Sequence, residues 1–172
     1  DLDELHRKFG VVFQNDAVFA DTIRENLDFG RNLSEDSLRA ATQDAMAAEF
    51  IEGYEDGLDH RSVIRGANFS GGQRQRLLIA RALAAHPDIL ILDDASSALD
   101  YRTDAALRQA IANHHADTTL VVIAQRVSSI LSMDHILVMD EGRMIGYGTH
   151  EELMQTCPVY REICEVQMGE VA

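Results

Sequence analysis

The chain has 172 residues, 46% of them hydrophobic and 26% charged, which is an ordinary composition for one soluble domain with a buried core. Its 29 acidic and 15 basic residues give a formal net charge of −14, which disfavours free association with nucleic acid or an anionic membrane surface. No apolar stretch approaches the roughly 20 residues that span a bilayer, no signal peptide is visible at the acidic N-terminus, and Cys157 and Cys164 are expected to be free thiols in a reducing compartment.

The first half of the chain predicts one strand followed by helices and loops. A short apolar, β-branched segment ends at the polar Gln14 and is typical of a buried strand. Ser34 is a good N-cap for a helix with an acidic first turn, and Gly53 is expected to end that helix. His86-Pro87 stops the last helix, in which Arg81 is expected to pair with acidic neighbours. In chain order, we expect a strand over 9–14, a short helix over 22–27, one helix over 34–53, a loop over 54–69 and a helix over 74–85.

Beyond residue 88, strands alternate with helices, which is the pattern of an α/β fold. Two of these strands are continuously apolar, as in a parallel sheet that is covered on both faces. Asp100 is an expected N-cap, Asp140-Glu141-Gly142 is a hairpin signal, and Thr149 opens a capping box. We expect strands over 89–92 and 118–124, a helix over 101–114, a hairpin of strands over 135–139 and 143–147, and two C-terminal helices, the second beginning at Pro158.

Two motifs in the middle of the chain suit a nucleotide carrying a metal ion. Ser70-Gly71-Gly72-Gln73 opens a helix, and a helix N-terminus preceded by glycines presents free N–H groups and a positive dipole end to phosphate. Asp93 and Asp94 follow a buried strand, and carboxylates at the carboxyl tip of a parallel strand suit the magnesium ion that a phosphate carries. The alternative is a surface turn, which the four apolar residues before these carboxylates make less favoured.

The order and spacing of several motifs resemble the ATPase domain of ABC transporters. The resemblance extends over the whole chain, and the segments over 20–27 and 148–153 resemble the exporter branch of that family. The motifs that carry it are SGGQRQR at 70–76, ARAL at 80–83, ILILDD at 89–94 and SALD at 97–100.

This resemblance implies a role for each candidate site residue. Ser70-Gly71-Gly72-Gln73 would cap the γ-phosphate of an ATP molecule that a partner subunit holds. Asp93 would hold Mg²⁺ through water, and Gln14, at the Q-loop position, would serve both the metal and the catalytic site. Asp94 stands at the position of the catalytic base, and Asp100 belongs to the D-loop, which acts on the nucleotide site across the dimer interface.

Two positions depart from the family pattern. Asp94 replaces a glutamate, and its shorter side chain withdraws the carboxylate by about 1.5 Å. A general base must lie within hydrogen-bond distance of the proton that it takes, so this change should slow hydrolysis strongly. Gln125 replaces the switch histidine, and glutamine can bind a γ-phosphate but cannot shuttle a proton. With both changes and an intact signature, the chain resembles the subunit of a heterodimeric exporter that carries the degenerate nucleotide site. The loop over 62–68 also lacks the glutamate that exporters often carry there.

A further departure concerns the phosphate-binding loop. An ATPase of this class uses a G-x-x-x-x-G-K-[ST] loop, and the sequence contains none, since its only lysine is Lys8. The chain therefore resembles the C-terminal two-thirds of such a domain, without the Walker A strand and the N-terminal β-subdomain. We expect the chain alone to be inactive, and an exposed sheet edge and apolar surface to make it poorly stable or prone to associate.

The resemblance implies an α/β fold, with a partial P-loop NTPase-type parallel sheet and an inserted α-helical subdomain. It implies ATP and Mg²⁺ as cofactors, and a second ABC ATPase domain and the transmembrane domains of an exporter as partners, with no nucleic acid. The location would be the cytoplasmic face of the plasma (inner) membrane, within a membrane-fused chain. The expected segments are a strand ending at the Q-loop (1–14), the helical subdomain with the signature (15–87), the α/β core (88–148) and the C-terminal helices (149–172).

Two other functions remain open at this point. Without a P-loop, the chain could be a non-catalytic module that docks its signature face on another ATPase and regulates it. It could also be a relative without a transport function, such as those that act in DNA repair or translation. The exporter-like tail and the acidic balance disfavour that last reading.

Overall fold

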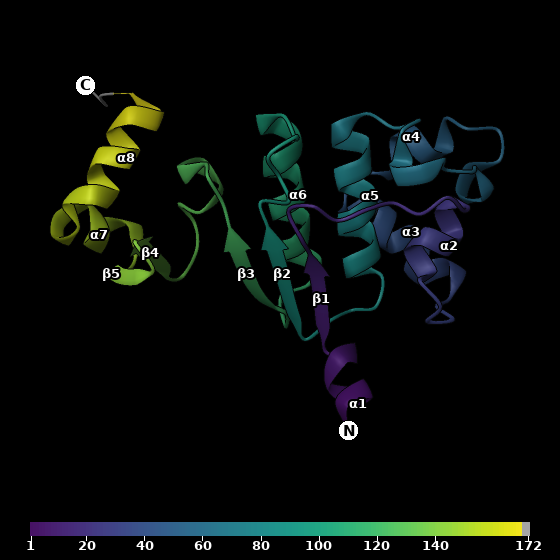
Figure 1. The fold of residues 1–172 in the computed structure, drawn as a ribbon, viewed down its shortest axis with the longest axis horizontal. Helices are drawn as coiled ribbons and strands as arrows, with labels where there is room; N and C mark the ends of the chain where they lie inside the picture. The colour runs from purple at the N-terminus through teal and green to yellow at the C-terminus, as the bar shows by residue number, and fades with distance from the viewer. Residues whose placement is uncertain (170–172) are drawn as a thin grey trace. The chain divides into compact units, whose positions relative to one another are not determined.

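In the computed structural model, which describes residues 1–169, the chain forms two compact units. The first unit is Asp1–Ile123, and the second begins at Ala124 (Figure 1). The finer division at residues 14, 87 and 148 stays a prediction. No helix within the described part of the chain is long and apolar enough to cross a membrane.

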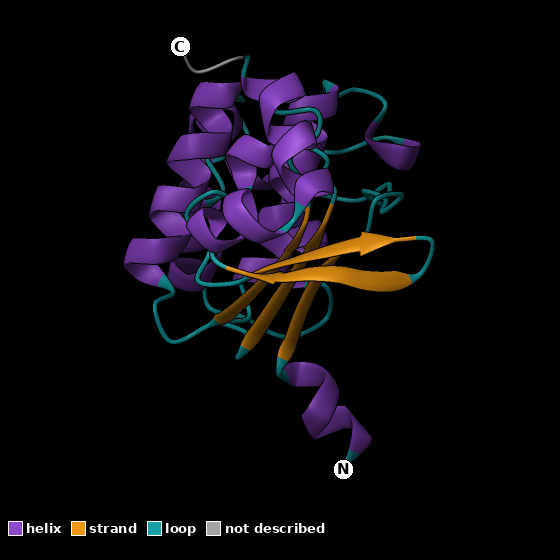
Figure 2. Cartoon of the chain, turned by 90° about the vertical axis from the view of Figure 1, so that its left-hand side faces the viewer, coloured by secondary structure: helices purple, strands orange, loops and turns teal. Residues whose placement is uncertain are grey.

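A three-stranded parallel sheet with the order β1-β2-β3 is the framework of the first unit (Figure 2, orange). Its strands are β1 (Phe9–Val12), β2 (Ile89–Asp93) and β3 (Thr119–Ile123), close to the predicted ranges. The register pairs Phe9 with Ile89 and Ile89 with Thr119. Parallel neighbours need a crossover connection, and here α5 precedes β2 while α6 joins β2 to β3. The predicted α/β fold with a parallel sheet is confirmed.

The helices of the first unit follow local capping signals. Thr22, Ser34, Ser70 and Asp100 each accept a hydrogen bond from a backbone N–H in the first turn of the helix that they open. Sequence analysis missed the first helix, whose side chains are all exposed and whose only apolar residues are Leu2 and Leu5. The helices are α1 (Leu2–Arg7), α2 (Ile23–Asp28), α3 (Glu35–Asp44), α4 (Ala48–Glu52), α5 (Gly71–Leu83) and α6 (Tyr101–His114), with 3-10 turns at Gly57–Asp59 and Ile64–Gly66.

The single helix expected over 34–53 is wrong, because the chain breaks between α3 and α4. Met46 adopts a left-handed conformation with φ of 57°, and the Ala47 N–H donates to the Thr42 carbonyl at 2.7 Å. Ala45 and Ala47 are fully buried, so the chain turns to place both small side chains in the core. The apolar spacing alone could not distinguish one helix from two.

The core of the first unit gathers around α5. Every residue from Leu77 to Leu83 is buried, and this helix also begins three residues earlier than expected, at Gly71 rather than Arg74. The sheet is not covered on both faces as expected, because Val121 and Ile123 of β3 are 43% and 49% exposed. The first unit therefore presents apolar side chains of its edge strand at the surface.

The second unit is a hairpin followed by two helices. The hairpin pairs β4 (Ile136–Asp140) with β5 (Arg143–Gly148) across a turn at Glu141 and Gly142, which both have positive φ. Then come α7 (His150–Thr156), which opens with the predicted capping box, and α8 (Pro158–Met168), which begins at Pro158 as predicted. A 3-10 turn at Val127–Ser129 precedes the hairpin.

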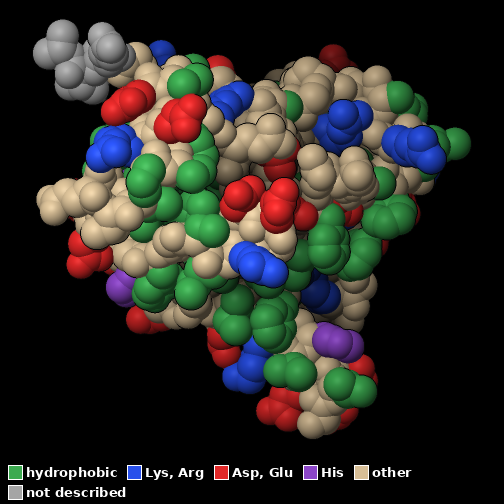
Figure 3. Space-filling view, turned by 60° about the vertical axis from the view of Figure 1, so that its left-hand side comes forward, with side chains coloured by type: hydrophobic (Ala, Val, Ile, Leu, Met, Phe, Trp, Pro, Cys, Tyr) green, Lys and Arg blue, Asp and Glu red, His purple; other side chains and the backbone are tan. Residues whose placement is uncertain are grey.

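A small core of its own supports this second unit. It includes Leu153 and Tyr160, and both cysteines, Cys157 and Cys164, lie in it as free thiols. Burial raises the pKa of the Cys164 thiol, so this group stays protonated at neutral pH. Apolar side chains of the hairpin remain exposed, and apolar side chains show in green on the surface in Figure 3.

Gly10 offers a test of the packing between β1 and α5. A Cβ atom at Gly10 would lie 2.8 Å from the Ala82 carbonyl oxygen and 2.8 Å from Pro87 Cγ. We expect Gly10→Ala to lower the free energy of unfolding by about 1–3 kcal/mol, the usual range for overpacking a core, as measured by urea denaturation. Gly71→Ala is the control, since its Cβ would meet nothing closer than 3.6 Å. Equal effects of the two changes would contradict the packing argument.

Candidate functional site

The first element of the site is the N-terminus of α5. Ser70 Oγ accepts a hydrogen bond from the Gln73 N–H at 3.2 Å, and Gln73 Oε1 accepts one from the Ser70 N–H at 2.9 Å. This capping box leaves the N–H groups of Gly71 and Gly72 in the first turn, where no intrahelical acceptor exists. The four predicted residues therefore form one exposed helix end that is suited to a phosphate.

The glycines of this helix end allow close packing against the turn after β2. A Cβ atom at Gly72 would lie 3.2 Å from the Ala98 carbonyl oxygen, and one at Gly71 would lie 3.6 Å from Ala98 Cβ. Larger side chains at Gly72 would force the helix end and the turn apart. The signature residues and the SALD segment are thus neighbours, although 24 or more residues separate them in sequence.

The second element is the pair of carboxylates at the end of β2. Asp93 is the last residue of the strand and pairs with Ile123 of β3. Asp94 has a φ of 51°, a left-handed conformation that is uncommon outside glycine, and its N–H donates to the Ile123 carbonyl at 2.9 Å. Both side chains are half-buried at the carboxyl edge of the sheet, where sequence analysis placed them.

Gln14 lies at the same edge. β1 and β2 are parallel and pair Val12 with Leu92, so Gln14 and Asp94 each follow that pair by two residues. Within the described residues, no group of three or more His, Cys, Asp or Glu side chains is placed to hold a metal ion by itself. A magnesium ion here would therefore complete its oxygen shell from phosphate and water, together with Asp93 and the amide oxygen of Gln14. That donor set fits the preference of Mg²⁺.

The segment after Gln14 is anchored by a buried arginine that sequence analysis assigned to acidic neighbours. Arg81 Nη1 donates to the Ala17 carbonyl at 3.0 Å, and its other nitrogens donate to the carbonyl and the side-chain oxygen of Asn26, each at 2.8 Å. Asp16 is also near, at 3.7 Å, but most partners are carbonyls. The guanidinium packs over the rings of Phe19 and Phe29, and burial lowers the pKa of Arg81.

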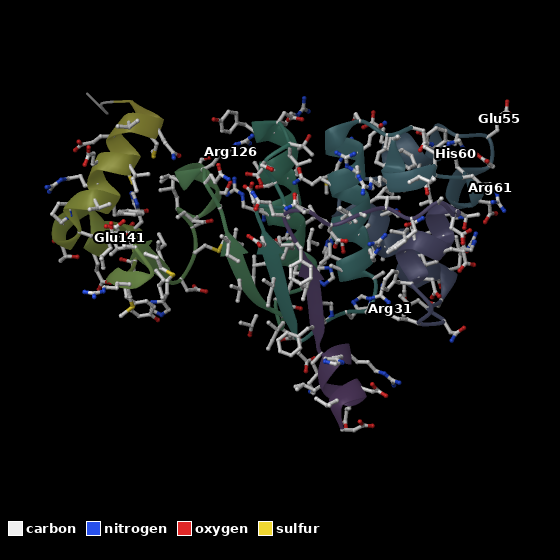
Figure 4. The ribbon with its side chains drawn as sticks, in the orientation of Figure 1. Arg31, Glu55, His60, Arg61, Arg126 and Glu141 are labelled. Carbon is white, nitrogen blue, oxygen red and sulfur yellow. The ribbon has the colours of Figure 1, made fainter. Side chains whose placement is uncertain are left out.

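Two further arginines also donate to backbone carbonyl groups. Arg31, labelled in Figure 4, donates to the Arg81 carbonyl at 2.7 Å. Arg76 donates to the Met46 carbonyl and packs over the Phe50 ring. These arginines satisfy carbonyl groups of loops and of the last turns of α2 and α5, and no sequence pattern marks such partners in advance.

Asp100 caps α6. Its carboxylate accepts hydrogen bonds from the Thr103 N–H at 2.9 Å and from the Thr103 hydroxyl at 2.7 Å. These bonds, the backbone one first, lower the pKa of Asp100, so the carboxylate stays charged well below neutral pH. The side chain therefore has a structural function here, and its role at a nucleotide site stays a prediction.

Gln125 belongs to the second unit. Its backbone carbonyl accepts a hydrogen bond from Gln167 Nε2 at 2.7 Å, and Gln167 Oε1 accepts one from the Val127 N–H at 2.8 Å. Gln167 of α8 thus fixes the backbone on both sides of Arg126, which Figure 4 labels. The predicted role of Gln125 at the γ-phosphate stays a prediction, while the other predicted residues all lie in the first unit.

A comparison with known families decides what this chain is related to. Residues 1–97, more than half of the chain, match the family described as ABC transporter. The chain belongs to the ABC transporter family.

Several relatives of this chain lie within the ABC transporter family. An uncharacterised ABC transporter ATP-binding protein of Mycobacterium tuberculosis is 39% identical over 169 residues, which cover 96% of this chain and 29% of that protein. A protein of Vibrio vulnificus named ATP-dependent lipid A-core flippase is 40% identical over 172 residues, covering 99% of this chain and 30% of the flippase. The solved structure of a bacterial Atm1-family ABC exporter with ATP bound has a TM-score of 0.92 and 37% identity.

The predicted resemblance to an exporter-type ABC domain is therefore confirmed. The solved exporter structure covers 98% of this chain, and this chain spans 30% of that exporter. The chain likewise spans 29–30% of the curated ABC relatives described above. The fold and the family of this domain are thus established, and the activity and partners of a whole ABC exporter are matters for proposal.

Proposed function

We propose that this chain is part of the ATP-binding domain of an ABC exporter subunit, in which ATP-driven closure of two such domains drives export across a membrane. One observation carries the proposal: the exposed helix end of Ser70–Gln73 lies against the turn that follows the Asp93 carboxylate. In this proposal, the phosphate-binding helix end and the magnesium-binding carboxylate share one packed framework. The names of the relatives, a lipid A-core flippase and an ATP-bound exporter, support the same function.

In this proposal, one group of site residues binds the nucleotide of this domain and another group binds the nucleotide of the partner domain. Asp93 and Gln14 hold the magnesium of the nucleotide that this domain itself carries, and Mg²⁺ supplies neutralisation of charge on the phosphate oxygens. Ser70–Gln73 bind the γ-phosphate of the ATP on the partner domain through backbone N–H groups and the helix dipole. Asp100 lies in the segment that contacts the partner. The partner is a second ABC ATPase domain, and transmembrane domains receive the motion.

We further propose that this domain owns the slow site of a heterodimer, at the cytoplasmic face of the plasma (inner) membrane. Asp94 has a shorter reach than glutamate for taking a proton from water, and Gln125 cannot carry a proton as histidine does. The Ser70–Gln73 signature is intact, so the site that it completes on the partner is the fast one. Hydrolysis by the pair would then depend more on this chain's signature than on its own carboxylates.

A matched pair of capping boxes tests the role of the signature. Ser70→Ala and Thr149→Ala each remove an N-cap side chain that accepts a first-turn N–H, at 3.2 and 3.3 Å. Both are expected to lower stability by about 0.5–2 kcal/mol. Only Ser70→Ala should also lower the steady-state ATPase of the intact pair, by about tenfold or more, because it loosens the helix end whose N–H groups are proposed to bind transition-state charge on the γ-phosphate. Equal losses of turnover in the two variants would contradict a phosphate-binding role.

A second comparison tests the slow-site assignment. Asp94→Asn keeps the shape of the side chain and removes its capacity as a base. Because the proposal assigns little turnover to this site, Asp94→Asn should reduce the ATPase of the intact pair much less than Ser70→Ala does. The measurement is kcat for each variant, divided by the amount of folded protein. If Asp94→Asn is the more damaging change, the slow-site assignment is wrong.

The size of the native product separates this function from a regulatory module. We expect an antibody against this chain to detect a product much larger than 19.1 kDa in the membrane fraction, since the relatives are more than three times its length. The measurement is an immunoblot of fractionated cells. A native product of 19.1 kDa outside the membrane fraction would instead favour a module that docks on another ATPase.

A further inference from the structure

Gln75 lies in the second turn of α5, and its side chain contacts the loop that follows β2. Its Nε2 donates to the Asp94 carbonyl at 3.1 Å and to Ser97 Oγ at 3.4 Å. Its Oε1 accepts the Ala98 N–H at 2.8 Å. One side-chain amide thus uses its oxygen and its nitrogen on three residues of the same turn.

The backbone that Gln75 holds is a strained one. Asp94 has a φ of 51°, and such a conformation at a residue other than glycine persists only where its surroundings determine it. On one side, the Asp94 N–H is bound by the Ile123 carbonyl of β3. On the other side, the Asp94 carbonyl accepts from Gln75 and from the Ser97 hydroxyl, the latter at 3.0 Å. Gln75 is a contact that comes from outside the sheet and the turn.

The same side chain joins two parts of the proposed site. Gln75 follows the capping residue Gln73 by two positions on one rigid helix, and Gly72 of that helix approaches the Ala98 carbonyl. A displacement of the Ser70–Gln73 helix end therefore moves the partners of Gln75 as well. The hydrogen bonds of Gln75 thus couple the position of the signature helix end to the backbone conformation at Asp94.

We propose that Gln75 is a positioning residue, which fixes the Asp94–Ala98 turn to α5 and so links the carboxylates of one nucleotide site to the signature that serves the other. The inference rests on the proposed ATPase function. It assigns Gln75 no contact with nucleotide. Its loss should therefore lower turnover while leaving nucleotide affinity unchanged.

The test uses the intact two-subunit transporter with Gln75→Met, which keeps the length of the side chain and removes its hydrogen bonds. Gln109→Met is the matched control, because Gln109 is an exposed helix glutamine that donates to Asn113 Oδ1 on its own helix. Two quantities are measured on each preparation. One is amide exchange of residues 93–100. The other is ATP turnover divided by the amount of a fluorescent ATP analogue bound at saturation, which removes the effect of unfolded protein.

We expect Gln75→Met to speed exchange over 93–100 selectively and to lower turnover per bound nucleotide about tenfold. The reason is that this turn leads into Asp100 and packs on the signature helix, which are proposed to act on the fast site of the partner, and small misplacements at a reacting site have effects of this size. KM should stay unchanged. Gln75→Glu keeps the acceptor for the Ala98 N–H, so it should fall between wild type and Gln75→Met. Gln109→Met should match wild type in both quantities.

Three results would overturn the inference: unchanged exchange over 93–100, unchanged turnover per bound nucleotide, or an equal effect of Gln109→Met. Failure of the proposed function is a different result, in which the wild-type transporter binds nucleotide but hydrolyses none. In that case, the exchange over 93–100 still decides whether Gln75 fixes the turn.

Discussion

The parallel pairing of β1 with β2 is the constraint on which the first unit depends. It joins Phe9 to Ile89, so every element between them must leave one edge of the sheet and return to the adjacent strand. This arrangement brings Gln14 and Asp94 to one edge of the sheet. It also packs α5 against β1 so closely that only glycine fits at position 10. The helix end of Ser70–Gln73 lies at the other end of α5, where it packs against the turn that contains Ala98.

Sequence analysis succeeded where the signal was local. The caps at Ser34, Asp100 and Thr149 and the turn at Glu141-Gly142 were all readable from neighbouring residues, as were the strands. It failed where distant contacts decide. The break at Met46 depends on burial of the flanking alanines. Arg81 does pair with the acidic Asp16, but its hydrogen bonds to carbonyls 55 and 64 residues away were not foreseen. Gln75 was passed over for the same reason, since its contacts lie 19–23 residues ahead.

The identity of residue 94 joins two physical effects. A left-handed backbone is tolerated more readily by Asp and Asn than by most side chains, and Asp94 has that backbone. The shorter side chain at this position thus relieves backbone strain while it reduces the reach of the carboxylate. In the proposed function, hydrolysis needs the longer reach, whereas the backbone conformation of this turn favours the shorter residue. The conformation and the proposed slow chemistry therefore favour the same amino acid.

The pairing of β1 with β2 also has a consequence for synthesis. Residue 9 cannot meet its partner until residue 89 has left the ribosome, and at bacterial or eukaryotic elongation rates the intervening 80 residues take roughly 4–16 s. During that interval α2, α3 and α5 can form, but β1 lacks its partner β2. Chaperones that shield short apolar segments would act on β1 in that window, before the two strands pair.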